Sequence, residues 1–220
     1  MMLVRLGWSI TLMTFDIYID DDHHLTCQVE KEMCVARVNQ QEKDRSRERI
    51  VRGAARLFRE RGVEGASVGE VMKEAGLTHG GFYRHFATKD AMLDGALEAA
   101  FREIVAPLEA GLAEEDGAVV GQKFRQFYLS DDHLYNAGLG CPAAALAGEI
   151  ARAPQTTKQT FAAGFRKMLA LMTRTKTGDL ARREVKAARE LAMMVGAMTI
   201  ARASDPETAQ LVLLACRDQS

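Results

Sequence analysis

The chain has 220 residues, of which 47% are hydrophobic and 27% charged, and its formal net charge at pH 7 is −1. This composition is typical of a folded protein of one or two domains and excludes a collagen-like or mostly disordered chain. No stretch reaches the roughly 20 apolar residues that a membrane-spanning helix needs. The first residues lack the cleavage pattern of a signal peptide, so we expect a cytoplasmic protein.

The potential metal ligands and thiols of the sequence do not form a recognisable site. The cysteines Cys27, Cys34, Cys141 and Cys216 contain no Cys-x-x-Cys pair and are expected to be reduced thiols. The run Asp20–His24 has metal-ligating residue types, but adjacent residues cannot all converge on one ion, and a solvated acidic loop is the preferred interpretation. We therefore expect neither a metal nor a cofactor.

Residues 1–42 differ in composition from the rest of the chain. The segment from Trp8 to Ile19 is rich in β-branched and aromatic residues, which favours a strand, but no partner strand is obvious. We expect 1–42 to be an N-terminal extension. It is either a disordered tail or an over-extended reading frame, with the working protein starting near Met33.

The near-zero net charge conceals a basic block. Residues 43–90 contain eleven basic and seven acidic side chains, whereas residues 91–220 contain fifteen and sixteen. A small basic module joined to a neutral body predicts a polyanion-binding domain over 43–90, and the competing interpretation is a solvated helix face rich in arginine.

Four helices are predicted in and just after this block. The first begins at Asp44 and ends at Gly62, and its apolar stripe repeats at helical spacing through Ile50, Ala54, Leu57 and Phe58. Ser67 and Glu70 form a capping box at the start of the second helix, which Gly76 terminates. Thr78 is expected to cap a short third helix that ends near Phe86, and Thr88 a fourth that Pro107 breaks or kinks.

The remainder is also helical in pattern. Proline and glycine positions predict that Gly178 separates two long helices, and they place helices near 119–130, 142–152, 155–176, 180–203 and 206–217. No alternating strand pattern follows residue 43. The predicted fold class is all-α, with 43–90 and 91–220 as two successive domains.

The segments 67–75 and 78–86 have the spacing of a helix-turn-helix, with the tight turn at Ala75–Thr78. The three small helices are expected to share a core made of Leu57, Phe58, Val68, Val71, Phe82 and Phe86. A second helix of this kind enters the major groove of DNA with its first residues foremost. The alternative is that a helix–Gly–helix unit serves core packing alone.

The first residues of the second helix suit contact with DNA. Gly80 and Gly81 have no side chains to hold the helix away from the bases, and His79 offers a donor or acceptor to a base edge. Tyr83, His85 and Lys89 can reach phosphates.

Residues 47–97 resemble the DNA-binding domain of the TetR/AcrR family of bacterial transcriptional regulators. The resemblance rests on Arg49-Ile50, on Ala54–Phe58, on Ser67–Val71, on Ala75–Phe86 and on Lys89–Leu93, with the run Phe82–Phe86 followed by Lys89 as its most distinctive part. It implies that Ser67, Thr78, Tyr83, His85 and Lys89 contact phosphates and that His79, Gly80 and Gly81 read bases. It also places Arg45 and Arg47 in a flexible arm that reaches the DNA backbone or minor groove.

The same resemblance implies a homodimeric repressor. It would bind a palindromic double-stranded DNA operator and be released from it by a small-molecule effector. Dimerisation would use the last two helices, with Leu191, Met194, Val195, Met198, Leu211 and Leu214 as candidates, and these residues otherwise face the protomer's own core. Effector-pocket candidates, each of which could instead be plain core, are Phe124, Phe127, Tyr128, Phe161, Phe165, Met168 and Met172.

The segment Gly138–Glu149 resembles that of a subgroup with Gly-Cys-Pro in the ligand domain. Cys141 lies just before a predicted helix start, where amide dipoles favour a thiolate, so an alternative function is a redox or electrophile sensor acting through Cys141. The alternative to a sensor is a small residue chosen for close helix packing. A thiol enzyme that used Cys141 with His133 as its base would need a third triad residue and an oxyanion-binding motif. The sequence shows neither, so we expect no enzyme activity.

Overall fold

The computed structural model describes residues 17–19 and 25–217, and divides the chain into two units, 1–45 and 46–220. In the first unit, β1 (Ile17–Ile19) pairs antiparallel with β2 (Leu25–Cys27), with Tyr18 opposite Thr26. The sequence had suggested no partner for this strand. Most of the Trp8–Ile19 segment, and the Asp20–His24 run, lie outside the described residues.

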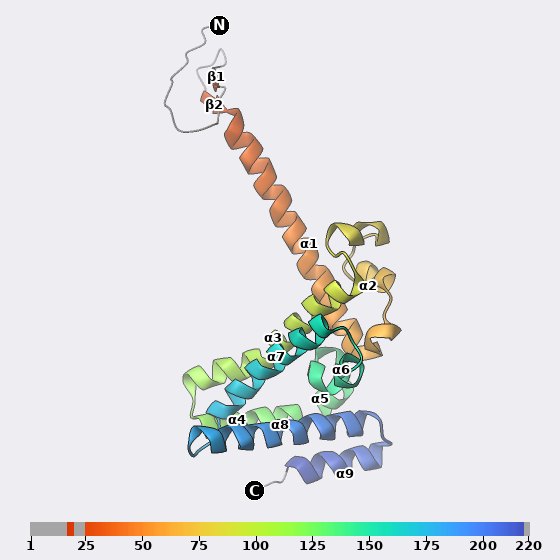
Figure 1. Ribbon diagram of the computed structural model, residues 1–220, viewed down its shortest axis with the longest axis vertical. Coiled ribbons are helices and arrows are strands. Elements are labelled where there is room, and N and C mark those ends of the chain that lie inside the picture. The colour runs from red at the N-terminus through yellow and green to blue at the C-terminus, as the bar shows by residue number, and fades with distance from the viewer. Residues whose placement is uncertain (1–16, 20–24, 218–220) are drawn as a thin grey trace. The chain divides into compact units, whose positions relative to one another are not determined.

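Apart from this hairpin, the described residues form helices and loops, which confirms the all-α fold class (Figure 1). Helix α1 (Gln28–Gly65) crosses from the first unit into the second. It therefore begins far ahead of the predicted start at Asp44. Gly62, the predicted end, has φ 76° and ψ 168°, and the helix is interrupted there before a last turn that reaches Gly65.

The helices of the basic block follow the prediction closely. α2 (Val68–Glu74) is capped by the predicted box, in which Ser67 and Glu70 exchange hydrogen bonds. Gly76, at φ 70°, turns the chain into η1 (His79–Arg84), which is a 3-10 helix rather than an α-helix. Thr78 precedes η1 but makes no capping hydrogen bond with its side chain, so that part of the prediction is wrong.

Helix α3 (Lys89–Glu114) starts at the predicted cap, since Thr88 accepts a hydrogen bond from the amide of Ala91. Pro107 was expected to break or kink this helix, and it does not break it, because the helix continues through Pro107 to Glu114. The remaining helices lie close to the predicted ranges: α4 (Gly117–Tyr128), α6 (Pro142–Ile150), α7 (Gln155–Arg174), α8 (Leu180–Arg202) and α9 (Pro206–Arg217). The sequence did not predict α5 (Asp131–Tyr135) or η2 (Ala137–Leu139).

Two hydrophobic clusters form the interior of the second unit. One contains all of the expected helix-turn-helix core: Leu57, Phe58, Val71, Phe82 and Phe86 are buried, and Val68 packs against them. The other joins α4, α7, α8 and α9. Helix α3 contributes to both, with Met92–Ala100 in the first and Phe101–Leu108 in the second, so the two cores share one continuous helix rather than separating at residue 90.

Candidate nucleic-acid interface

The helix-turn-helix presents η1 at its surface. Thr78, His79, Gly80 and Tyr83 are exposed, whereas Phe82 is buried in the core and anchors η1 from below. Tyr83 is 74% exposed and its ring meets that of Phe82 edge-on, with the ring centroids 5.2 Å apart. Gly81 and His85 are half-buried. The outward face of η1 is thus formed by the residues expected to contact DNA.

The glycines of η1 are not required by the packing of the chain itself. A Cβ atom placed on Gly80 would meet no heavy atom within 4 Å, and one on Gly81 would make only ordinary contacts, the nearest at 3.6 Å from Met72. Neither residue has the positive φ that favours glycine, unlike Gly62 and Gly76. Neither the space around Gly80 nor its backbone conformation therefore requires a glycine there.

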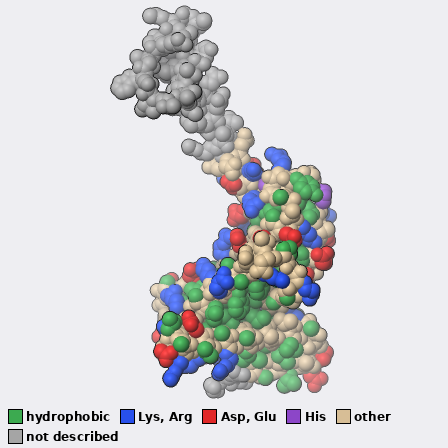
Figure 2. Space-filling model, viewed as in Figure 1, with side chains coloured by type: hydrophobic (Ala, Val, Ile, Leu, Met, Phe, Trp, Pro, Cys, Tyr) green, Lys and Arg blue, Asp and Glu red, His purple; other side chains and the backbone are tan. Residues whose placement is uncertain are grey.

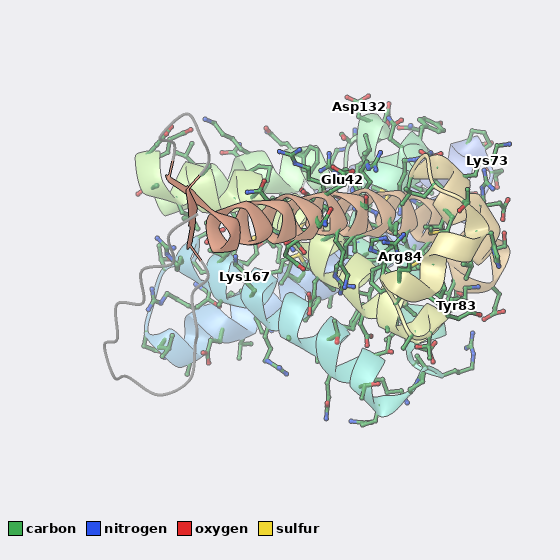
Figure 3. All side chains as sticks on the ribbon, turned by 90° about the horizontal axis from the view of Figure 1, so that it is seen from above. Glu42, Lys73, Tyr83, Arg84, Asp132 and Lys167 are labelled. Atoms are coloured by element: carbon green, nitrogen blue, oxygen red, sulfur yellow. The ribbon has the colours of Figure 1, made fainter. Side chains whose placement is uncertain are left out.

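The positions around η1 carry the remaining candidates. Ser67 is exposed, and its hydroxyl is already engaged with Glu70 in the capping box, whose hydrogen bonds lower the pKa of the Glu70 carboxyl. Lys89 is half-buried, with its ammonium 6.0 Å from the centre of the Phe58 ring. Arg84, which the sequence interpretation left out, is exposed on η1 next to Tyr83 in sequence, and Figure 3 labels both residues.

The two arginines assigned to a flexible arm are helical. Arg45 is an exposed residue of α1 within the first unit. Arg47 folds back onto the helix-turn-helix: its guanidinium lies 4.2 Å from the centre of the Phe86 ring and donates a 2.8 Å hydrogen bond to the carbonyl of His85. The structure thus places both arginines in α1 rather than in a flexible arm, and Arg47 holds the end of η1 in place.

The candidate dimer residues separate into two groups. Leu191, Met194 and Met198 are 0% exposed and belong to the protomer's own core, which corrects their assignment to a partner surface. Val195 is partly buried against the same core. Leu211 and Leu214 on α9 are 68% and 49% exposed, and Ile200 on α8, which the sequence interpretation missed, is 53% exposed. The helical period alone could not show which of the two apolar faces of α8 is internal.

The pocket candidates lie in or against the second core. Phe124, Tyr128, Met168 and Met172 are buried, and the side chains packed partly buried against them are Phe161 and Phe165. Phe127 is 45% exposed. Figure 2 shows hydrophobic side chains gathered at the surface of the helical body in that view.

Cys141 is fully buried at the N-cap of α6. The amides of Ala143 and Ala144 face the thiol and favour its thiolate, as expected for a helix start, but burial has the larger effect and raises the pKa of the Cys141 thiol. His133 does not act on the thiol either, because its Nε2 accepts the backbone N–H of Cys141 at 2.9 Å. The expectation of an activated thiolate is therefore wrong for this conformation.

Among the described residues, no cluster of His, Cys, Asp and Glu could hold a metal ion, and no described helix is long and apolar enough to cross a membrane.

The comparisons with known proteins agree with this geometry. Residues 50–96 match the family model of bacterial regulatory proteins, tetR family. The chain is 44% identical over 55 residues to the HTH-type transcriptional regulator AcrR of Shigella flexneri, covering 25% of this chain and 26% of AcrR. It is 35% identical over 107 residues to an uncharacterized HTH-type regulator, Rv0196, of Mycobacterium tuberculosis, covering 47% and 52% of the two chains.

Solved structures extend the likeness of fold to the helical body. A TetR-family transcriptional regulator from Agrobacterium tumefaciens aligns over 80% of this chain and 98% of its own, with a TM-score of 0.63 and 21% identity. Reduced Escherichia coli NemR aligns over 78% and 94%, with a TM-score of 0.62 and 22% identity. The chain spans about a quarter to a half of the two curated relatives named above. The helix-turn-helix of this chain therefore matches the tetR family of bacterial regulatory proteins, and the helical body shares the fold of solved TetR-family regulators.

Proposed function

We propose that this chain is a sequence-specific DNA-binding transcriptional regulator that acts in the cytoplasm as a homodimeric repressor. The observation that carries the proposal is Gly80, which is exposed, has no positive φ and faces open space. A glycine that its own protein does not need, on the outward face of a helix-turn-helix, keeps that face clear for close approach of another molecule. The surrounding histidine, tyrosine and lysine support the major groove of DNA and its phosphates as that partner.

The roles at the DNA follow from exposure and side-chain chemistry. His79 and the bare backbone at Gly80 and Gly81 face base edges. Phosphates are contacted around them by the set Ser67, Thr78, Tyr83, His85 and Lys89. We add Arg84, because an exposed guanidinium beside Tyr83 is well suited to bind a phosphate. Arg47 is assigned a positioning role, since its guanidinium is engaged with the His85 carbonyl and the Phe86 ring.

For the dimer we propose a surface formed by Ile200, Leu211 and Leu214, three of the exposed apolar side chains of α8 and α9. Apolar side chains of this size at the surface gain free energy when a second copy covers them. The symmetric pairing of two such surfaces would place two helix-turn-helix domains on one palindromic site.

For the effector we propose an apolar small molecule received beside α7, where Phe161 and Phe165 are only partly buried and stack at 6.4 Å between ring centroids. Binding there would act on α3, because the Phe161 ring meets that of Phe101 edge-on at 5.3 Å. Helix α3 also contributes residues to the core of the helix-turn-helix domain.

The test is a selection of genomic DNA fragments by the purified full chain at a stated salt concentration, followed by sequencing. We expect one enriched palindrome, bound by a dimer whose formation is lost in Leu211→Glu. Weak binding to DNA without sequence preference would contradict the proposal. The matched control is Leu180→Glu, which changes another exposed leucine, at the start of α8.

The sensor alternative has a separate test. If Cys141 responds to oxidants or electrophiles, operator release by hydrogen peroxide or N-ethylmaleimide will disappear in Cys141→Ser. The burial of the thiol and its raised pKa weigh against that response, because the thiolate is the reactive form.

A further inference from the structure

A buried arginine links helix α1 of the helix-turn-helix domain to the loop that precedes α6, residues 136–141. The side chain of Arg59 is 1% exposed. Its Nη1 donates to the carbonyl of Gly140 at 2.9 Å, its Nη2 to Glu103 Oε2 of α3 at 2.7 Å, and its Nε to the carbonyl of Ala55 at 2.9 Å. A charge this deeply buried is tolerated only with such complete pairing. Arg59 therefore joins α1, α3 and the 136–141 loop at one point.

Two glycines let that loop approach its neighbours. A Cβ atom on Gly138 would lie 2.4 Å from Glu60 Oε1 and 2.8 Å from Arg56 Cγ, both on α1. A Cβ atom on Gly140 would lie 2.6 Å from His133 Nε2 and 2.7 Å from Arg202 Nη2. Gly138 thus permits the loop to contact α1, and Gly140 permits the loop to contact the interior of the helical body.

The chain of contacts continues from the loop to α8. The imidazole of His133 accepts the Cys141 amide at Nε2, so its Nδ1 carries the proton and donates to the carbonyl of Tyr128 at 2.6 Å. Arg202, in the last turn of α8, donates to the carbonyl of His133 at 2.5 Å. An unbroken series of buried or half-buried contacts therefore runs from Arg59 through Gly140, Cys141 and His133 to Arg202. Figure 1 shows α5 and α6 beside the C-terminal end of α1 and next to α8.

We propose that Arg59 is a positioning residue that couples the helix-turn-helix domain to the 136–141 loop and, through His133 and Arg202, to α8. This proposal rests on the proposed DNA-binding function. It names a second route between the helical body and the helix-turn-helix domain besides α3, and the two routes meet at the Arg59–Glu103 pair. Because coupling between sites is reciprocal, DNA bound at the helix-turn-helix domain must alter the opening of the loop.

The buried thiol provides the readout. Cys141 is fully buried, so its alkylation by N-ethylmaleimide requires the loop to open and the Arg59–Gly140 hydrogen bond to break. The rate at Cys141 is measured by mass spectrometry on the full chain, with and without the selected operator duplex. We expect the duplex to slow alkylation of the wild-type chain at least about fivefold, at the lower end of ordinary coupling.

The variant is Arg59→Lys, which keeps the charge but cannot reach three acceptors with one ammonium group. We expect the duplex to change its rate less than about twofold, although operator binding at saturating protein persists. The control is Arg61→Lys on the same helix, whose exposed side chain pairs with Glu70, and it should retain the wild-type slowing. A purely structural role for Arg59 would raise the rate equally with and without DNA.

The outcomes are distinguishable. If no duplex is selected, the proposed DNA-binding function is wrong. If the duplex is bound but the wild-type rate is unchanged, or if Arg59→Lys retains the full slowing, the coupling proposal alone is wrong. If Arg59→Lys does not fold, Arg202→Lys tests the same series of contacts from the α8 end with the same expectation.

Discussion

The glycines of two regions of this molecule are present for opposite reasons. In η1, a side chain on Gly80 would meet nothing within 4 Å, whereas in the 136–141 loop a side chain on Gly140 would lie 2.6 Å from the imidazole of His133. The loop glycine is explained completely by internal packing. Internal packing does not require the η1 glycine, and we attribute it to the proposed contact with DNA. Comparing the space around these two glycines therefore separates a position that the fold requires to be glycine from one that it does not.

The largest effect expected at the 136–141 loop is a loss of folding stability at low pH. Burial, and the charges of Arg202 and Arg59, lower the pKa of His133 to about 4, although its bond to the Tyr128 carbonyl opposes the shift. The unfolded chain therefore binds this proton first, so stability is full above about pH 6.5 and is lost as the pH falls towards 4. We expect about 3 kcal/mol of stability to be lost over that window. Urea unfolding at a series of pH values measures it, and an equal slope in His133→Gln would assign the loss to other groups.

A substitution at Gly140 is expected to have the next largest effect. Gly140→Ala forces a Cβ atom against His133 and Arg202, and overpacking of this kind costs about 1–3 kcal/mol. The cost is measured by urea unfolding of both chains at pH 7. Stability within 0.5 kcal/mol of wild type, as an approximate limit, would show that the loop relaxes freely and that its close approach is not required.

On the η1 side, His79→Ala should reduce discrimination at the operator. We expect a loss of about 1–3 kcal/mol on the best site and little change on unrelated DNA, because only a base contact is removed. Shift assays on the selected site and on a scrambled duplex provide the measurement. An equal loss on both duplexes would make His79 a phosphate contact instead.

The smallest expected effect belongs to Lys89. Lys89→Ala should weaken binding to all sequences alike and make the dependence of log K on log salt shallower by about one, since one phosphate contact is lost. Titrations at several salt concentrations test this. Glu98→Ala, an exposed position further along α3, is the control and should leave the slope unchanged.

The sequence predicted the fold well where local signals decide it. The capping box at Ser67 and Glu70, the turn at Gly76 and the boundaries of the long helices each depend on one or two residues with strong conformational preferences. The start of α1 was missed because no cap or breaker marks Gln28. The continuation of α3 through Pro107 depends on packing along the rest of the helix, which the local signal of a proline does not include.

The candidate site divides in the same way. The outward residues of η1 could be predicted because their spacing is fixed by the helix-turn-helix, with Phe82 marking the inner face. The assignments of Arg47 and Leu191 failed because each depends on a tertiary neighbour. Arg47 meets Phe86, far from it in sequence, and Leu191 lies on a face of α8 that faces inward. The Arg59–Gly140 contact joins residues 81 positions apart, and no local pattern in the sequence indicates it.

The central claim is that the face of η1 at Gly80 is kept clear for DNA, and Gly80→Ala tests it most directly. Stability and operator affinity are measured on the same preparations of wild type and variant. We predict unchanged or slightly higher stability, by up to about 1 kcal/mol, together with a loss of operator affinity of at least about tenfold. Unchanged affinity in a stably folded Gly80→Ala chain would contradict the account.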